Sequence, residues 1–314
     1  MDFSHSGLKK TYRATVSDYL FFLNGLPNSS DLVSGAYQYW LVVLSIIVVV
    51  FSAYSAFSIE NYSESMSSGT FRTTLVTLGG VALGTGIWAM DFIGMVSFDL
   101  PGEVNFNLYP TIFSLFPSLA GSIFVMHFLA GKRGGWKRIA LAGVVFGLGI
   151  GVMHYIGMSA IEMDGHIRYQ PLPFAQSFLI AFGLSIVALW FRRFICTEYP
   201  KSEQITTSLS ALVVGLAAAA IHYSTLRIAL FLKHTSVDFP PLTGSDPHLL
   251  VLGVAGASLV ITILILMVVL GETTRQRVTN LTLEEADRWY RNMIESAPDG
   301  ILTLQVQPEL RSGE

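Results

Sequence analysis

The chain has 314 residues, of which 52% are hydrophobic and only 13% are charged, and its mean hydropathy is +0.54. This composition is too apolar for a soluble globule and predicts a protein that crosses a membrane several times. A net charge of -3 without a basic stripe excludes a nucleic-acid partner. The single cysteine, Cys196, excludes an internal disulfide and a thiolate metal cluster.

Residues 1–36 are mixed and polar, and we expect an N-terminal extracytoplasmic segment there. Its aromatic patch at 19–23 is too short for a signal peptide or a spanning helix. Seven apolar runs follow, each close to the roughly 20 residues that a bilayer core requires. They lie at 37–59, 73–98, 111–130, 139–163, 174–195, 205–232 and 248–270. The sequence therefore predicts an all-α membrane protein, with seven transmembrane helices bundled into one domain over residues 37–270.

Basic residues are concentrated in every second connection between these runs. One set of connections carries Arg72; Lys132, Arg133, Lys137 and Arg138; Arg192, Arg193 and Lys201; and Arg275 and Arg277. The alternate set carries only Arg168 and Lys233. Because short cytoplasmic loops are rich in Lys and Arg, the first set is predicted to be cytoplasmic. The N-terminus is then outside and the C-terminus is in the cytoplasm.

A motif recurs three times near the end of a predicted helix. It is GIGVMHYIGM at 149–158, GTGIWAMDFIGM at 84–95 and GLAAAAIHYSTL at 215–226. Its central residue is Asp91, then His154, then His222. Small residues stand eleven and seven positions before each of these three, and small residues four apart let membrane helices approach closely. The sequence therefore predicts three helix-pair repeats plus one additional helix.

All three motif helices run from inside to outside on this topology, so their central residues are expected to meet at one depth near the outer leaflet. Ionisable groups in a membrane indicate a functional site, and imidazole and thioether are both copper ligands. The candidate metal ligands are Asp91, His154, His222, Met90, Met95, Met153 and Met158. The alternative is that the methionines are packing residues and that the histidines are hydrogen-bonded between helices.

Three further ionisable residues need an interpretation. Glu162 extends the His154 face of its helix outward. Arg227 lies about one turn beyond His222, and Arg227 or either histidine could pair with Asp91. His127 also follows a methionine, but it lacks the small-residue pattern and lies near the inner face. We interpret it as an interfacial histidine and not as a fourth copy.

After residue 270 the chain becomes polar. Residues 271–295 are predicted to form a cytoplasmic linker helix, and 296–314 contain a turn followed by a strand pattern. We interpret 296–314 as the truncated start of a further cytoplasmic domain.

The motifs resemble those of the MHYT family, bacterial integral-membrane sensory domains named for a Met-His-Tyr-Thr signature. Met153-His154-Tyr155 matches it directly, Ile221-His222-Tyr223-Ser224 matches in part, and Met90-Asp91-Phe92 has Asp in place of His. Residues 288–304 similarly resemble the opening of a PAS domain. The resemblance implies a sensor in the bacterial inner membrane with output domains in cis for cyclic-di-GMP turnover or histidine-kinase activity. It also implies copper, with O2, CO or NO as a further ligand. Because one His and two Met are missing, zinc is the alternative metal.

Three functions follow from these observations. The first is a membrane sensor with no catalysis in the region present, whose partners are the lipid bilayer, a metal ion and the output domains; a homodimer is left open. The second is a metal-ion transporter or channel, but the repeats are parallel and not inverted. The third is a membrane zinc-dependent hydrolase, for which Glu162 is the only general base that stands out.

Overall fold

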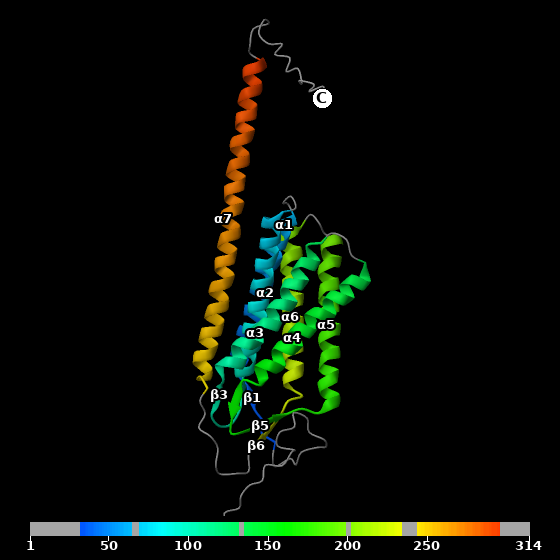
Figure 1. Cartoon of the computed structure of the whole chain (residues 1–314), viewed down its shortest axis with the longest axis vertical. Helices are drawn as coiled ribbons and strands as arrows, with labels where there is room; N and C mark the ends of the chain where they lie inside the picture. Colours follow the sequence, from blue (N-terminus) through cyan, green and yellow to red (C-terminus); the bar gives the residue numbers. More distant parts are fainter. Residues whose placement is uncertain (1–31, 65–68, 132–134, 199–201, 234–243, 296–314) are drawn as a thin grey trace, which may run out of the picture. The chain divides into compact units, whose positions relative to one another are not determined.

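The computed structural model describes residues 32–64, 69–131, 135–198, 202–233 and 244–295. Most of the predicted N-terminal segment and all of the PAS-like region at 296–314 lie outside these ranges. The described residues form seven α-helices, each with a stretch of 21 to 28 residues apolar enough to cross a membrane. They are α1 (Tyr39–Glu64), α2 (Thr70–Val96), α3 (Leu108–Leu129), α4 (Trp136–Met158), α5 (Pro171–Glu198), α6 (Glu203–Leu226) and α7 (Pro247–Glu295). The predicted all-α, seven-helix membrane fold is confirmed (Figure 1).

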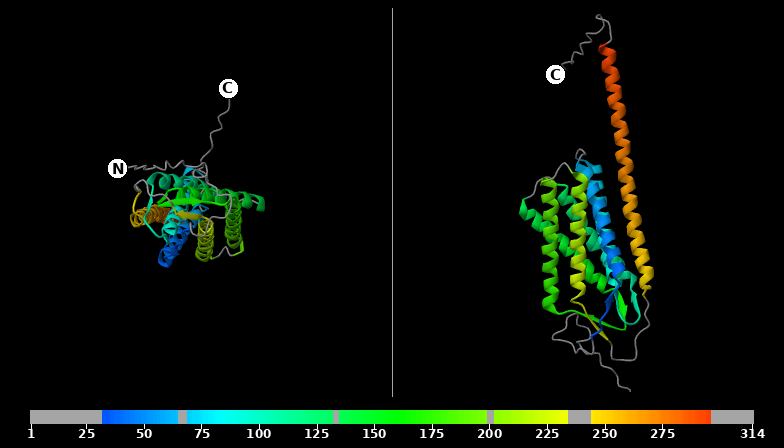
Figure 2. Two further views of the ribbon diagram at one scale, coloured as in Figure 1. Left: turned by 90° about the horizontal axis from the view of Figure 1, so that it is seen from below. Right: turned by 180° about the vertical axis from the view of Figure 1, so that it is seen from behind.

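Six of these helices form a closed ring. Each of α1 to α5 packs against the next helix in the chain, and α6 packs against α1. In addition, α2, α4 and α6 contact one another. These are the helices that carry the three motif copies, so the ring brings the motifs together at its centre (Figures 1 and 2).

The repeated small residues explain how closely the ring helices pack. A Cβ atom on Gly80 of α2 would lie 2.5 Å from the Cα atom of Ile123 on α3. In the next repeat, a Cβ atom on Gly143 of α4 would lie 2.7 Å from the Cα atom of Ile186 on α5. Any side chain at these positions would push two helix backbones apart. The glycines therefore serve as helix contacts, as the spacing of small residues in the sequence predicts.

In the third repeat, α6 packs its small-residue face against α1. A Cβ atom on Gly215 would lie 3.2 Å from the Cα atom of Val50 on α1. The three predicted helix pairs each consist of a motif helix and the helix that follows it in the chain. On that prediction, α6 would pair with α7. This pairing is corrected by the structure: α1 closes the ring and α7 is the additional helix.

A hydrogen bond repeated between helices supports this assignment. Tyr155 of α4 donates its hydroxyl to Ser177 Oγ of α5 at 2.6 Å, because that serine donates its own proton to a backbone carbonyl. Tyr223 of α6 makes the same bond to Ser45 Oγ of α1 at 3.0 Å. Ser177 and Ser45 each stand six residues after the first residue of their helix. Thus α1 occupies the position in the third repeat that α5 occupies in the second.

Short strands join the three repeats at one end of the bundle, which we call the strand end; the opposite end is the loop end. Three antiparallel pairs form there: β1 (Ala36–Tyr37) with β2 (Phe98–Asp99), β3 (Val104–Phe106) with β4 (Ile161–Met163), and β5 (Gly165–Arg168) with β6 (Leu230–Lys233). The segment after each motif helix thus pairs with the segment of another repeat. These strands are not evident from the sequence, because two to four residues are too few to show an alternating pattern.

The part of the chain from Met267 onward forms a separate compact unit. Within it, α7 continues without a break to Glu295, so the predicted linker range 271–295 is helical. Two exposed ion pairs link side chains four residues apart on this helix, Arg288 with Glu284 and Arg291 with Asp287. Such pairs stabilise a solvent-exposed helix by about 0.3–0.5 kcal/mol each.

Candidate functional site

Three ionisable side chains from the three motif helices meet in the interior of the bundle. Asp91 Oδ1 on α2 accepts a hydrogen bond from His154 Nδ1 on α4 at 2.8 Å and from His222 Nδ1 on α6 at 2.7 Å. All three side chains are 0% exposed. The predicted convergence of these residues is confirmed, and we call them the central cluster.

The shared acceptor determines where the imidazole protons lie. Because Oδ1 of Asp91 accepts from both Nδ1 atoms, each neutral imidazole carries its proton on Nδ1 and a lone pair on Nε2. Neither Nε2 atom, nor Asp91 Oδ2, has a hydrogen-bond partner among the described residues, although all three atoms are buried. Each of the three side chains offers a ligand atom within 4.8 Å of the others. A carboxylate that accepts the Nδ1 proton is the usual support of a metal-binding histidine.

Two motif glycines make room for the central cluster. A Cβ atom on Gly94 would collide with the imidazole of His222, and one on Gly157 would lie 3.3 Å from Asp91 Oδ2. Gly94 and Gly157 stand three residues after Asp91 and His154, so they recur in two copies of the motif. These two motif glycines therefore leave space for the polar side chain of a neighbouring motif helix.

The four candidate methionines do not share one environment. A Cβ atom on Gly157 would lie 3.2 Å from Met95 Cε and 3.3 Å from Asp91 Oδ2, so Met95 lies near the central cluster. Met90 and Met153 are fully buried in the apolar cluster of the bundle interior. Met158 belongs to the apolar cluster toward the strand end, with Met95. Metal ligation by any of the four stays a prediction.

Aromatic rings surround the central cluster on the strand-end side. The His154 and His222 rings lie edge to face at 5.1 Å, and each also contacts its motif tyrosine. Tyr169, which follows β5, packs edge-on against Tyr155 at 5.2 Å. Burial, together with the neighbouring Tyr155 and Asp91, raises the pKa of Tyr169 above its ordinary value. Its phenol therefore stays protonated and cannot serve as a base at neutral pH.

The other two residues singled out beside the motifs lie outside the central cluster. Glu162 on β4 accepts hydrogen bonds from Asn107 Nδ2 at 3.0 Å and from the backbone N–H of Gly244 at 2.9 Å. Its carboxylate therefore ties together three segments of the strand end. Arg227 follows the last residue of α6 and its guanidinium interacts with the Tyr37 hydroxyl. Of the three residues predicted as possible partners of Asp91, the two histidines bond to it and Arg227 does not.

His127 lies on the last turn of α3, at the loop end. Its Nε2 is 2.9 Å from Thr77 Oγ1, and the side chain is exposed. The interpretation that it is not a fourth motif copy agrees with this position.

A second buried polar cluster, which the sequence analysis missed, lies at the loop end. Arg192 on α5 donates to Glu60 Oε2 on α1 at 2.8 Å and to Asn61 Oδ1 at 2.7 Å, and its guanidinium lies 4.5 Å from the ring of Phe57. Arg192 is 2% exposed and Glu60 is 5% exposed. The available signal was Glu60 itself, because it is the first charged residue in an otherwise apolar helix. Arg192 had been interpreted only as a loop residue.

Comparison with known proteins identifies the family. The model of the MHYT family, described as a bacterial signalling protein N terminal repeat, matches residues 84–142 and 147–197. These two matched repeats contain Asp91 and His154, and His222 belongs to the third copy that follows them.

Three similar proteins are bacterial signalling proteins. The chain is 33% identical over 196 residues to the bifunctional diguanylate cyclase/cyclic di-GMP phosphodiesterase MucR of Pseudomonas aeruginosa, covering 62% of this chain and 28% of that protein. It is 32% identical over 185 residues to the cyclic di-GMP phosphodiesterase NbdA of the same organism, covering 59% and 23%. It is 27% identical over 198 residues to the signaling protein YkoW of Bacillus subtilis, covering 63% and 24%.

The aligned region spans about a quarter of the length of these relatives. No solved structure gives a significant match to the chain. The matched repeats, the relatives that share them and the three motif helices that meet at one centre agree with one another. The chain therefore contains MHYT repeats, which are found in bacterial signalling proteins.

Proposed function

We propose that the central cluster is a metal-binding sensory site whose occupancy is transmitted along α7 to a cytoplasmic output domain. The observation that carries this proposal is the set of three buried polar atoms without hydrogen-bond partners among the described residues: Asp91 Oδ2, His154 Nε2 and His222 Nε2. An unsatisfied buried polar group costs about 1–3 kcal/mol. A cation held by His154 Nε2 and His222 Nε2 would satisfy the lone pairs of both imidazoles.

The donors favour copper, with zinc as the alternative. Two imidazoles and one carboxylate suit Cu(II) or Zn(II), and the Met95 thioether beside the carboxylate adds a soft donor that favours copper. His154 and His222 would hold the ion through Nε2, and Asp91 would orient both rings through its Oδ1 atom. When bound, the ion supplies a Lewis-acid position at which O2, CO or NO can bind. The three side chains would hold that position in the buried interior of the bundle.

The surroundings of the central cluster favour sensing over transport or hydrolysis. Toward the loop end, α2 continues from Asp91 with Met90, Ile87 and Leu83, all fully buried in the apolar interior. An ion would have to cross this packed region to be transported. A hydrolase would need a free base near the site, but the Glu162 carboxylate is already bonded to Asn107 and Gly244.

We propose an output of the cyclic-di-GMP type for the whole protein, with a histidine kinase as the alternative. The two Pseudomonas aeruginosa relatives are named for cyclic-di-GMP synthesis or degradation. The proposed orientation in the bacterial inner membrane places the strand end outside and the end of α7 in the cytoplasm. A Cys196→Ser, Asp164→Cys variant would react with a membrane-impermeant maleimide from the periplasm. Labelling only after lysis of the inner membrane would reverse the orientation.

Metal analysis of the purified chain tests the metal proposal. The chain is stripped with a chelator in detergent, incubated with Cu(II) or Zn(II), desalted and analysed for bound metal by mass spectrometry. We expect close to one ion for each wild-type chain and at least a tenfold lower content in His154→Ala and in His222→Ala. Electron paramagnetic resonance of the Cu(II) sample should show nitrogen ligands.

His127→Ala is the matched control, because it removes a histidine from the same membrane domain but outside the central cluster. It should keep the wild-type metal content. A wild-type chain that retains neither metal, or a loss of metal that is equal in all three variants, would disprove the metal site. Copper retained where zinc is lost would decide between the two ions.

A further inference from the structure

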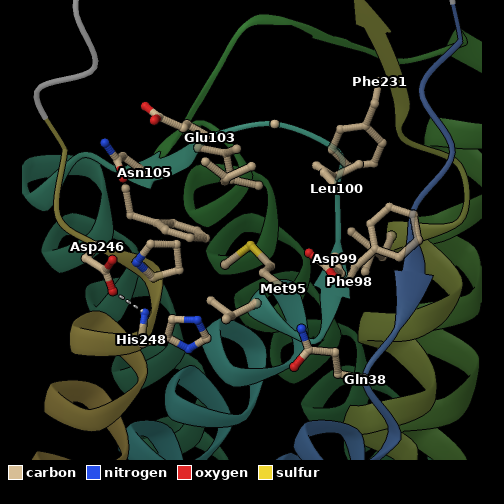
Figure 3. Close-up of a pocket in the computed structure, with 17 residues that line it drawn as sticks. Gln38, Met95, Phe98, Asp99, Leu100, Glu103, Asn105, Phe231, Asp246 and His248 are labelled. Atoms are coloured by element: carbon tan, nitrogen blue, oxygen red, sulfur yellow. Dashed lines mark hydrogen bonds between the residues drawn. The ribbon is translucent and has the colours of Figure 1, made fainter.

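A cavity of about 370 Å³ opens at the strand end of the bundle (Figure 3). Its volume lies at the lower end of the range of roughly 300–1,000 Å³ that is usual for small-molecule sites. Met95 and Leu226, at the ends of α2 and α6, contribute to its wall, and so does His248 in the first turn of α7. Figure 3 shows the Met95 thioether near the middle of the residues that line the cavity, with Asp99 beside Phe98.

The charge of the cavity lining is negative. Asp99, Glu103 and Asp246 line it, and no Lys or Arg occurs among its described lining residues. Asp246 accepts bonds from the backbone N–H groups of His248 and Leu249. The carboxylates of Asp99 and Glu103 have neither a hydrogen bond nor an ion pair within the described ranges. A ligand that carries positive charge would pair with the carboxylates of Asp99 and Glu103.

The same cavity has an aromatic wall. Phe98, Phe106 and Phe231 line it, and the Phe98 and Phe231 rings lie 5.6 Å apart. Phe106 and Phe231 are buried, while Phe98 is half-buried. The faces of aromatic rings attract ammonium groups, by about 0.5–2 kcal/mol for each contact. Phenyl rings beside carboxylates are therefore suited to an organic cation.

The arrangement of the acids favours an organic cation over a metal ion. Among the described residues, the one group of three or more acidic or histidine side chains close enough to share an ion is the central cluster. The carboxylates of the cavity thus do not form a group of three that could share one ion. We infer that this cavity binds a small organic amine, whose ammonium groups pair with Asp99 and Glu103 beside the phenyl rings.

The position of this amine site explains how a ligand there would act on the domain. Met95 is four residues after Asp91, and Leu226 is four residues after His222, so each lies one helical turn beyond the central cluster. A bound amine would therefore contact two motif helices and the start of α7 together. The inference builds on the sensory role of the family but requires no metal.

Isothermal titration calorimetry with putrescine tests the inference. The purified chain is studied in dodecyl maltoside, whose headgroup carries no ammonium, and 1,4-butanediol is the neutral probe of equal length. We expect saturable 1:1 binding of putrescine, at least tenfold tighter than that of butanediol. The Asp99→Asn, Glu103→Gln double variant should weaken it at least tenfold, and Asp164→Asn should change it less than twofold. Asp164 is the matched control because it is exposed at the same end but does not line the cavity.

Equal binding of the charged and neutral probes, equal binding to both carboxylate variants, or no binding by the wild type would overturn the inference. A further titration adds phosphatidylethanolamine: competition with putrescine would identify a lipid headgroup as the source of the ammonium, and no competition would identify a free amine. His154→Ala should bind putrescine normally. A wild-type chain that binds metal but not putrescine refutes this inference alone. A wild-type chain that binds putrescine but no metal refutes only the metal site.

Discussion

Asp91 explains why the first motif copy differs from the other two. Three neutral histidines at this centre would offer several N–H donors but no strong common acceptor. One carboxylate oxygen instead accepts from both imidazoles and orients their Nε2 atoms. The replacement of His by Asp is therefore compatible with the construction of the site, because it changes one ligand candidate into the group that positions the other two.

Asp91→Ala should destabilise the domain by about 3 kcal/mol. The substitution leaves two buried imidazole donors without an acceptor, and each such loss costs about 1–3 kcal/mol. The measurement is the free energy of unfolding in detergent, from a denaturant titration followed by circular dichroism. Asp164→Ala, which removes an exposed carboxylate, should stay within about 0.5 kcal/mol of the wild type. Equal stability of the two variants would show that the Asp91 bonds contribute nothing to folding.

At the scale of the helices, α1 acts as the packing partner of the third repeat although it precedes all three in the chain. The tyrosine-to-serine bond from α6 to α1 repeats the bond from α4 to α5. Together with the Gly215 contact to Val50, it places α1 in the helix ring. The repeats are thus closed in space by a helix that lacks the motif.

Ser45→Ala tests this role of α1. The variant removes the bond between the Tyr223 hydroxyl and Ser45 Oγ and should cost about 0.6–1.5 kcal/mol. Ser55→Ala is the matched control, since Ser55 is equally buried on α1 but bonds to the carbonyl of its own helix. Its stability should change less. Thermal unfolding of the two variants in the same detergent compares them, and the opposite order would argue against the interhelical bond.

Two buried polar clusters, separated by an apolar interior, lie among the residues that the structure describes. The central cluster joins α2, α4 and α6, while the Glu60 and Arg192 pair joins α1 and α5 near the loop end. Helices in a membrane gain little from hydrophobic burial against one another, so polar contacts and close backbone packing carry more of their specificity. The two clusters therefore fix how the ring helices align at two depths.

A double-mutant cycle at the loop end tests the second cluster. Glu60→Leu alone leaves the buried Arg192 without its carboxylate and should cost about 3–5 kcal/mol. Adding Arg192→Met removes the uncompensated charge, so the double variant should recover most of the lost stability. Equilibrium unfolding in detergent gives the coupling energy between the two residues. Strictly additive losses would mean that the pair does not interact in the folded domain.

The sequence by itself determined the seven helices, the threefold motif and the three residues that meet at its centre, because the length of an apolar run and a regular repeat are local properties. It could not determine that α1 closes the ring, since that pairing depends on the contact of Gly215 with Val50, far apart in the chain. The Glu60 to Arg192 pair is also formed by residues far apart in the chain, and the short strands have too few residues to show an alternating pattern. Only the tertiary structure decided which atom of Asp91 faces the histidines, because a hydrogen bond depends on side-chain position in three dimensions and not on spacing along the chain.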